Sequence, residues 1–267
     1  LDEAEARLLL RDAVREELLA LSETSGVSPL LDWLAGTGIA RGIEILCGVM
    51  GKMAGYGWTP GELAEITRRD LSRSASRLGQ VRRENLIQFL GAGDALMEMR
   101  GGKRLQAFQT EWPRLRELSA REENPDHLLP PVEQTLALLK GNWGKNGELL
   151  RLRDRMKEAG EKLAEALRGQ RLLPAEREMM DSLFPLLERI EGRYAATKRE
   201  RRALDFEDLQ LRACRLLEER EEVRRGLRRR IRFLMVDEYQ DTNGLQKRLI
   251  DSLRRHPDGK PAPGKLF

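Results

Sequence analysis

The sequence predicts a mainly α-helical protein that ends in a helix–strand–helix piece of an α/β domain. Among the 267 residues Leu far outnumbers Val and Ile, and aromatics make up only 5%, which favours helices over strands. Apolar residues recur at the spacing of one helix face along most of the chain. Only residues 231–236 form the short, nearly all-apolar run that is typical of a buried parallel strand.

The first helix is predicted over residues 1–21, where acids early in the segment suit the helix dipole. The same apolar spacing predicts further helices over residues 39–55, 82–98, 102–118, 131–140, 148–168 and 174–200. Turn signals separate them, among them Asn124-Pro125-Asp126 and Pro130-Pro131. The stretch GNWGKNG at 141–147 lacks the pattern G-x-x-x-x-G-K-[ST] of a phosphate-binding loop and predicts an ordinary loop.

Beyond residue 200 the pattern changes to helix, strand and helix. Asp205 is expected to be an N-cap, with Asp208 in the capping-box position of the helix that follows. The strand over 231–236 comes next, and Asp241, Thr242 and Asn243 offer caps for a last helix that runs to about residue 255. A single strand cannot make a sheet, so we expect its apolar sides to be covered by pairing with a second chain or by docking on the helical part.

Composition limits the classes of function. The chain has 48 Lys and Arg against 44 acids, a formal charge of +4 and a pI of about 9.2, a range in which nucleic-acid contact is worth testing. Cys47 and Cys214 lie far apart in apolar helical patterns, which predicts reduced thiols. The acidic start LDEAEA and the absence of an apolar run of ~20 residues predict a cytoplasmic protein without a membrane span. The first residue, Leu1, and the apolar end at Leu266 and Phe267 lead us to expect part of a longer protein.

The acid pair Asp237 and Glu238 directly follows the predicted strand. Two carboxylates at the end of a parallel strand suit nucleoside triphosphate hydrolysis, because ligands of open α/β sheets bind at that edge. One acid can hold Mg²⁺ through water and the other can activate the attacking water. The pair alone fits solvated strand-end acids as well.

The longer string DEYQDTN, residues 237–243, resembles motif II (Walker B) of the UvrD, Rep and RecB class of superfamily 1 DNA helicases. The string DFEDL at 205–209 is similar to the D-F-D-D-L that precedes motif II in these enzymes. The opening LDEAEARLLLRDAV resembles the segment that follows motif Ib in helicase/nuclease subunits of the AddA type. The resemblance is strong over 200–255, moderate over 1–25 and vague between them.

The resemblance implies two domains. Residues 1–200 would be domain 1B, a helical insertion, and residues 201–267 would be part of a RecA-like P-loop α/β domain. Asp237 would serve Mg²⁺ through water and Glu238 would act as the base. Gln240 would help bind the nucleotide, while Asp241, Thr242 and Asn243 shape the turn and its cap. ATP and Mg²⁺ would bind the intact protein, and this fragment, which lacks the phosphate loop, is expected to bind neither and to be inactive.

For the intact protein the resemblance implies an ATP-dependent DNA helicase, with an exonuclease in the AddA type. Together with an AddB-type partner protein it would act in double-strand break repair and recombination. A UvrD-like helicase without nuclease is one alternative. A free-standing helical DNA-binding or adaptor module that retains a helicase remnant is another.

Domain 1B lies beside DNA in this family, so the resemblance implies that its basic residues face phosphates. The run at 67–83 is opposed only by Asp70, and the run at 198–202 continues a basic helix. The candidate contacts are Arg68, Arg69, Arg73, Arg77, Arg82, Arg83, Arg193 and Lys198. A solvated face is the alternative for both runs, and a linker to the ATPase core explains the run at 198–202 equally well. Four tryptophans could stack on bases, but partly buried anchors are the commoner role of Trp33, Trp58, Trp112 and Trp143.

Overall fold

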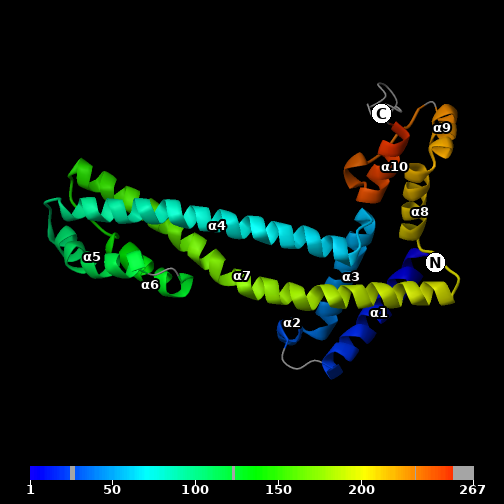
Figure 1. Cartoon of the computed structure of the whole chain (residues 1–267), viewed down its shortest axis with the longest axis horizontal. Coiled ribbons are helices and arrows are strands. Elements are labelled where there is room, and N and C mark those ends of the chain that lie inside the picture. Colours follow the sequence, from blue (N-terminus) through cyan, green and yellow to red (C-terminus); the bar gives the residue numbers. More distant parts are fainter. Residues whose placement is uncertain (25–27, 122–123, 232, 255–267) are drawn as a thin grey trace. The chain divides into compact units, whose positions relative to one another are not determined.

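The computed structural model describes residues 1–24, 28–121, 124–231 and 233–254 (Figure 1). The chain divides into two compact units. The first comprises Leu1–Ile66 together with Met179–Phe267, and the second comprises Thr67–Glu178. The predicted boundary between residues 200 and 201 separates domains of the resembled family and stays a prediction.

The helical part of the first unit contains α1 (Glu3–Thr24), α2 (Pro29–Thr37) and α3 (Ile39–Tyr56), with the start of α4 (Pro60–Met97) and the end of α7 (Gly147–Glu200). Its core joins apolar side chains from these helices, including Val14, Leu30, Leu46 and Leu187. Glu17 of α1 is 7% exposed and accepts hydrogen bonds from Arg189 and Arg193 of α7. Burial by itself would raise the pKa of Glu17, but these bonds outweigh it and lower the pKa.

The second unit contains most of α4, α5 (Lys103–Arg121), α6 (Pro125–Leu138) and the first part of α7. Trp112 is at the centre of its core, stacked on Phe108 and edge-on to Phe89. Trp143, in the loop at 141–146, is buried in the same core. The predictions of a loop there and of anchoring roles for Trp112 and Trp143 are therefore confirmed.

The mainly helical prediction is confirmed, but several boundaries are wrong. Residues 82–98 are the end of a helix of 38 residues, and residues 148–168 and 174–200 belong to one helix of 54 residues that continues through Pro174. The Pro130–Pro131 pair lies inside α6, which begins at Pro125 behind the Asn124 cap. Proline is tolerated where packing of the helix outweighs the lost backbone bond. The short helix α2 was not predicted.

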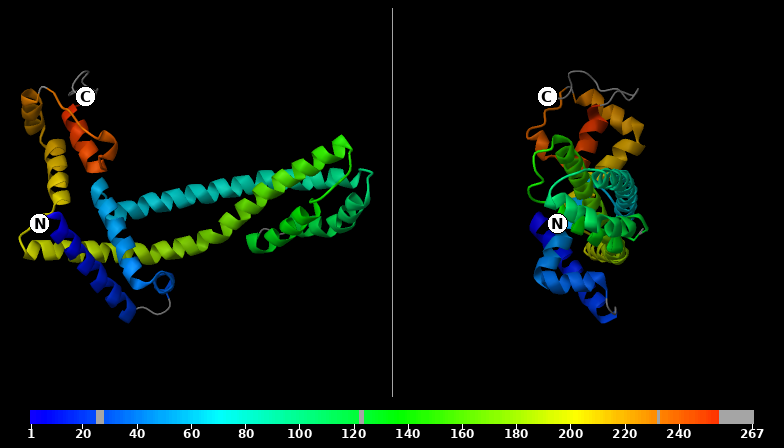
Figure 2. Two further views of the ribbon diagram at one scale, coloured as in Figure 1. Left: turned by 180° about the vertical axis from the view of Figure 1, so that it is seen from behind. Right: turned by 90° about the vertical axis from the view of Figure 1, so that its left-hand side faces the viewer.

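The C-terminal part of the first unit contains α8 (Phe206–Glu219), α9 (Glu221–Arg230), a 3-10 turn at Tyr239–Asp241 and α10 (Gly244–Arg254). Figures 1 and 2 show α9 following the end of α8, with α10 beside them, and each of the three helices contacts the other two. The predicted capping box is present, because the Asp205 side chain accepts from the Asp208 amide and the Asp208 side chain accepts from the Asp205 amide. The last helix ends at Arg254 in the described part of the chain.

The predicted strand over 231–236 is wrong for this structure. Its described residues, 231 and 233–236, form no regular strand and show only an isolated bridge at Leu234. A strand needs a neighbouring strand to pair its backbone groups, and the described residues contain no strand. Docking on the helical part is also wrong for Phe233 and Met235, which are 68% and 81% exposed. Pairing of this segment with a second chain stays a prediction.

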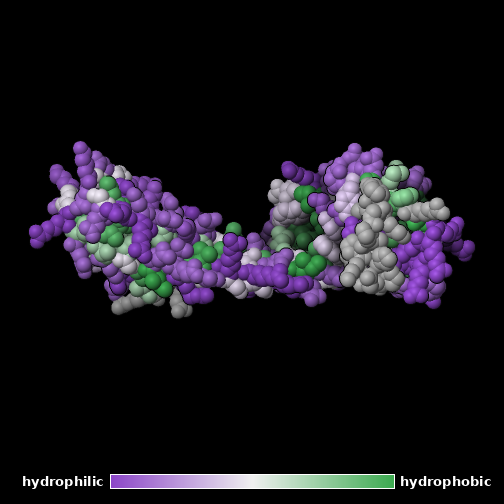
Figure 3. Space-filling view, turned by 90° about the horizontal axis from the view of Figure 1, so that it is seen from above, coloured by the Kyte–Doolittle hydropathy of each residue, from purple (hydrophilic) through white to green (hydrophobic). Residues whose placement is uncertain are grey.

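Polar residues predominate on the face of the molecule that Figure 3 draws. In the part of the chain that the structure describes, no single helix is long and apolar enough to cross a membrane, although the bent pair α2 and α3 meets that criterion together. Cys47 and Cys214 are free thiols, as predicted, and burial raises the pKa of both.

Candidate functional site

The acid pair lies at a tight turn between the extended segment and the 3-10 helix. Glu238 has φ 50° and ψ 45°, a left-handed conformation that non-glycine residues rarely adopt. Its backbone amide donates to Oδ1 of Asp237 at 3.0 Å, and its carbonyl accepts from the Asp241 amide at 2.9 Å. The Gln240 side chain donates to Oε2 of Glu238. The turn thus holds both carboxylates, Gln240 and Asp241 at one exposed place on the surface.

Asp237 has the chemistry of a magnesium ligand. A carboxylate oxygen is a donor that Mg²⁺ prefers, and Mg²⁺ sites in phosphate chemistry commonly use one or two carboxylates with waters and substrate phosphates. Among the described residues no three His, Cys, Asp or Glu side chains converge as a metal site. Asp237 therefore fits a Mg²⁺ ion that takes its other ligands from water and a nucleotide, and does not fit an ion enclosed by protein.

The turn is braced against α10. The Thr242 hydroxyl donates to the Tyr239 carbonyl at 2.7 Å. Asn243 and Gln246 form a reciprocal cap, in which each side chain accepts from the other residue's amide, at 2.8 and 2.9 Å. The prediction that this string caps the last helix is thereby confirmed, with Asn243 as the cap.

α10 is held on α8 by polar contacts from three positions along α8. The Asn243 side-chain Nδ2 donates to Oε1 of Gln210 at 3.4 Å, and the Cys214 thiol donates to the Leu245 carbonyl at 3.4 Å. Arg248 donates to both carboxylate oxygens of Glu218. Gln210, Cys214 and Leu245 are buried. The position of the acid pair therefore depends on α8 as well as on its own turn.

Lys198 occupies a buried joint between α7 and α8. Its ammonium group is 2.7 Å from Oδ2 of Asp205 and 2.6 Å from Oδ2 of Asp208. The Tyr194 hydroxyl donates to the same oxygen of Asp205 at 2.8 Å, and its ring lies 4.4 Å from the Lys198 ammonium. Burial by itself would raise the pKa of Asp205, but the hydrogen bonds from Lys198, the Asp208 amide and Tyr194 outweigh it and lower the pKa. The Lys198 ammonium group is therefore buried and paired with two carboxylates, and it is not exposed for a contact with DNA.

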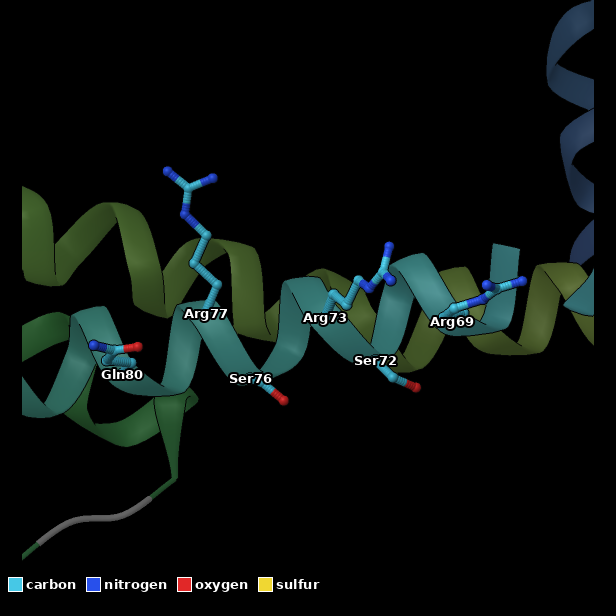
Figure 4. A pocket seen from close by; sticks show the side chains of 6 residues that line it. All are labelled: Arg69, Ser72, Arg73, Ser76, Arg77 and Gln80. Atoms are coloured by element: carbon cyan, nitrogen blue, oxygen red, sulfur yellow. The ribbon is translucent and has the colours of Figure 1, made fainter. Parts of the chain in front are cut away.

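The arginines of α4 are the most available of the predicted phosphate contacts. Arg69, Arg73 and Arg77 follow one another at four-residue spacing on one side of the helix, in the second unit. Figure 4 shows these three side chains extending from α4, with Ser72 and Ser76 pointing to the other side; together with Gln80 they line a shallow depression. Arg73 contacts Asp70 at 3.5 Å with both side chains mostly exposed. Within the described part of the chain, no acid pairs with Arg69 or Arg77.

The remaining basic candidates differ in availability. Arg68 and Arg83 are exposed, and Arg82 is half-buried and engaged in an interaction of its own. Arg193 donates to Glu16 at 2.8 Å and to Glu17 at 2.6 Å, so its guanidinium holds α7 on α1. We therefore define the arginine stripe as Arg68, Arg69, Arg73 and Arg77.

Sequence reasoning missed several residues around the acid pair. Gln210 follows DFEDL directly, but a polar residue on an amphipathic helix gave no sign that it would be buried. The contacts of Tyr56 and Gly57 with α10 involve residues about 190 positions apart, and no local pattern indicates them. Gly57, in the left-handed conformation after α3, could have been found as a helix C-cap.

Comparison with known proteins gives a family match. The family described as the UvrD/REP helicase N-terminal domain matches residues 81–259, more than half of the chain. The chain is also similar to an ATP-dependent helicase/nuclease subunit of Alkaliphilus metalliredigens (strain QYMF), with 38% identity over 77 residues that cover 29% of this chain and 6% of that protein. It is 47% identical over 62 residues to ATP-dependent DNA helicase Rep of Escherichia coli (strain K12), covering 23% of this chain and 9% of Rep.

A third similar protein is the corresponding ATP-dependent helicase/nuclease subunit of Streptococcus pyogenes serotype M5 (strain Manfredo), 36% identical over 77 residues, or 26% of this chain and 6% of that protein. The matches thus span 9% or less of the length of these curated relatives. No solved structure matches this chain.

Proposed function

Because this chain belongs to the family of UvrD/REP helicase N-terminal domains, we propose that it is part of an ATP-dependent DNA helicase in which Asp237 and Glu238 serve ATP hydrolysis. The observation that carries the proposal is the string DEYQDTN at 237–243, which lies inside the matched region and whose two acids stand exposed at one tight turn.

Each carboxylate has a separate task in this proposal. Asp237 would hold Mg²⁺ through water, and the ion would supply charge neutralisation at the phosphates. Glu238 would orient and deprotonate the attacking water, because a carboxylate that forms no ion pair within the described residues can accept a proton. Gln240 donates to Glu238 and so fixes the direction of its carboxylate. The left-handed backbone of Glu238 supports a functional role, because strain of this kind is concentrated at active sites.

The helical part would contact DNA through the arginine stripe. Phosphate contacts need only positive charge within reach, and the stripe offers exposed guanidinium groups along one helix.

We further propose that the parent protein is a helicase/nuclease of the AddA type, which works with a partner protein in double-strand break repair. The names of two similar proteins support this choice, whereas the match to Rep supports a helicase without nuclease. A nuclease domain elsewhere in the parent protein would decide between them.

The test uses the longer protein that contains this chain. Wild type should hydrolyse ATP in the presence of DNA and Mg²⁺. Glu238→Gln should lower kcat by about 100-fold or more while nucleotide binding persists, because general-base catalysis contributes roughly 10²–10⁴-fold. Asp237→Ala should lower kcat and also raise the Mg²⁺ concentration needed for activity.

Two controls accompany this experiment. Asp12→Asn, at an exposed acid on α1, should leave hydrolysis unchanged. The 267-residue chain alone should hydrolyse no ATP, since it contains no G-x-x-x-x-G-K-[ST] to cradle the phosphates. Full activity of the longer Glu238→Gln protein, or turnover by the chain alone that this substitution abolishes, would contradict the proposal.

A further inference from the structure

Two glycines, Gly244 and Gly57, allow the start of α10 to pack closely against the C-terminal turn of α3. A Cβ placed on Gly244 would lie 2.5 Å from Cδ1 and 3.0 Å from Cα of Tyr56. A Cβ on Gly57 would lie 2.6 Å from the buried side chain of Leu245, and one on Gly55 would lie 3.7 Å from Asn243. The two segments therefore approach more closely than residues with side chains would permit, and we call residues 55–58 the α3 turn.

The α3 turn is itself fixed to the core of the first unit. Gly57 adopts φ 69°, its amide donates to the Ala54 carbonyl, and the Trp58 amide donates to the Met53 carbonyl at 3.0 Å. This is the usual way in which a glycine ends a helix. Met53 is buried, and the Trp58 side chain packs against the same core cluster.

Tyr56 connects this fixed turn with α10. Its ring stacks on Trp58, with ring centroids 4.6 Å apart and planes 15° from parallel. The same ring lies against Gly244, so the core, Trp58, Tyr56 and Gly244 form a series of consecutive contacts. Tyr56 is 51% exposed, so it can be substituted without emptying the core.

Hydrogen bonds between residues close in sequence connect Gly244 with the acid pair. Gly244 begins α10 directly behind the Asn243 cap. From there the Thr242 amide donates to Tyr239 at 3.2 Å, and the Asp241 amide donates to Glu238 at 2.9 Å. A displacement of Gly244 must therefore move this short braced segment, at whose far end Glu238 lies.

We propose that Tyr56 is a positioning residue for the acid pair: stacked on Trp58 and in contact with Gly244, it sets where α10 begins and hence where the Glu238 carboxylate stands. The inference rests on the proposed role of Glu238 in ATP hydrolysis. Tyr56 touches neither nucleotide nor water in this account and acts through Gly244.

The first measurement uses this chain and needs no activity. Tyr56→Ala removes the ring, and Gly244→Ala adds a Cβ that the ring cannot accommodate. In both variants the amides of Lys247, Arg248 and Leu249, in the first turns of α10, should exchange with solvent deuterium about tenfold faster. Tyr56→Phe keeps the ring and should behave as wild type. Gly48→Ala, whose Cβ meets nothing within 4 Å, is the matched glycine control.

The second measurement uses the longer protein. Tyr56→Ala and Gly244→Ala should lower kcat for ATP hydrolysis by about tenfold while KM for ATP changes by less than about twofold, because small displacements of a catalytic group impair the chemical step. Tyr56→Phe, which keeps the ring, should have the wild-type kcat.

The two measurements separate the possible failures. Faster exchange with an unchanged kcat, or a change in KM alone, would make Tyr56 merely structural and overturn the inference. Unchanged exchange in both variants would overturn the contact on which it depends. A wild-type protein that hydrolyses no ATP would overturn the proposed function, and the positioning role with it, even if exchange responds as expected.

Discussion

Lys198 shows how the environment of one side chain decides its role. By sequence it belongs to a basic run, yet its ammonium lies between two carboxylates and over an aromatic ring at the joint of α7 and α8. A buried ammonium has to be paired, because an isolated charge in the protein interior is costly. The partners Asp205 and Asp208 belong to the string DFEDL, so this string has a structural task in addition to capping α8.

We predict a pH-dependent stability from the same joint. The folded-state pKa of Asp205 is below its ordinary value of 3.8. Its contribution to the free energy of unfolding is therefore complete above the unfolded pKa and is lost as the pH falls through the folded pKa. Asp205→Asn keeps a good N-cap but loses the charge, so it should lower the free energy of unfolding by about 2–3 kcal/mol at pH 7.

Urea unfolding at a series of pH values checks this. The difference between wild type and Asp205→Asn should shrink toward zero at acidic pH below 3.8. Asp12→Asn, at an exposed acid of α1, should change little at any pH. A difference between wild type and Asp205→Asn that is constant across the pH range would show that the charge of Asp205 does not stabilise the joint.

At the scale of the element, long helices pack closely through small residues. Gly93 of α4 faces the ring of Trp112 on α5, and a Cβ there would lie 2.2 Å from Trp112 Cζ2. Trp112 cannot easily move, because it is 1% exposed and its indole nitrogen donates to Asp94 at 3.1 Å. The spacing of α4 and α5 is thus set where Gly93 meets the indole.

Two glycines on α4 give a matched test of this packing. Gly93→Ala should lower the free energy of unfolding of the second unit by about 1–3 kcal/mol, the usual cost of overpacking. Gly91→Ala, where a Cβ meets nothing within 4 Å, should instead raise it by about 0.5–1 kcal/mol through helix propensity. Tryptophan fluorescence during urea unfolding, in a protein that carries Trp33→Phe and Trp58→Phe, reports on Trp112 and Trp143 of the second unit. Destabilisation by both glycine substitutions would contradict this account.

At the scale of the whole molecule, net charge is a poor guide to DNA binding. A charge of +4 on 267 residues is small, because most basic side chains are matched by acids. A local excess of positive charge matters more for DNA affinity, since each phosphate that a cation neutralises releases condensed counterions. The arginine stripe has such an excess, because its four arginines lie within ten residues and Asp70 is the one acid of that segment.

We therefore predict weak, sequence-independent DNA binding whose salt dependence comes from the stripe. Log affinity for duplex DNA should fall with log salt by ~0.9 per phosphate contact. Replacing Arg68, Arg69, Arg73 and Arg77 with Ala should flatten that slope by up to ~3.6, with unchanged helicity, since exposed charges add little stability.

The matched control removes four other exposed arginines of the second unit, Arg114, Arg151, Arg155 and Arg177. Salt titrations of binding by wild type and both quadruple variants, with circular dichroism in parallel, make the comparison. If both variants flatten the slope equally, the binding follows total charge and not the stripe.

The sequence by itself determined the features that depend on neighbours a few residues apart. Apolar spacing indicated most helices, the Asp205–Asp208 box marked the start of α8, and the string at 237–243 indicated the helicase family and the acid pair. These predictions succeed because helix propensity, capping and short motifs act within about one helical turn.

Only the tertiary structure decided which residues meet across the chain. It buried Lys198 against Asp205, placed Tyr56 on Gly244, and left Phe233 and Met235 exposed where a strand was expected. The apolar pattern at 231–236 indicates a preference for a strand, but a strand also needs a neighbouring strand to pair with, and that depends on other parts of the chain. Burial and partnership are set by contacts between distant segments, and for that reason no local pattern contains them.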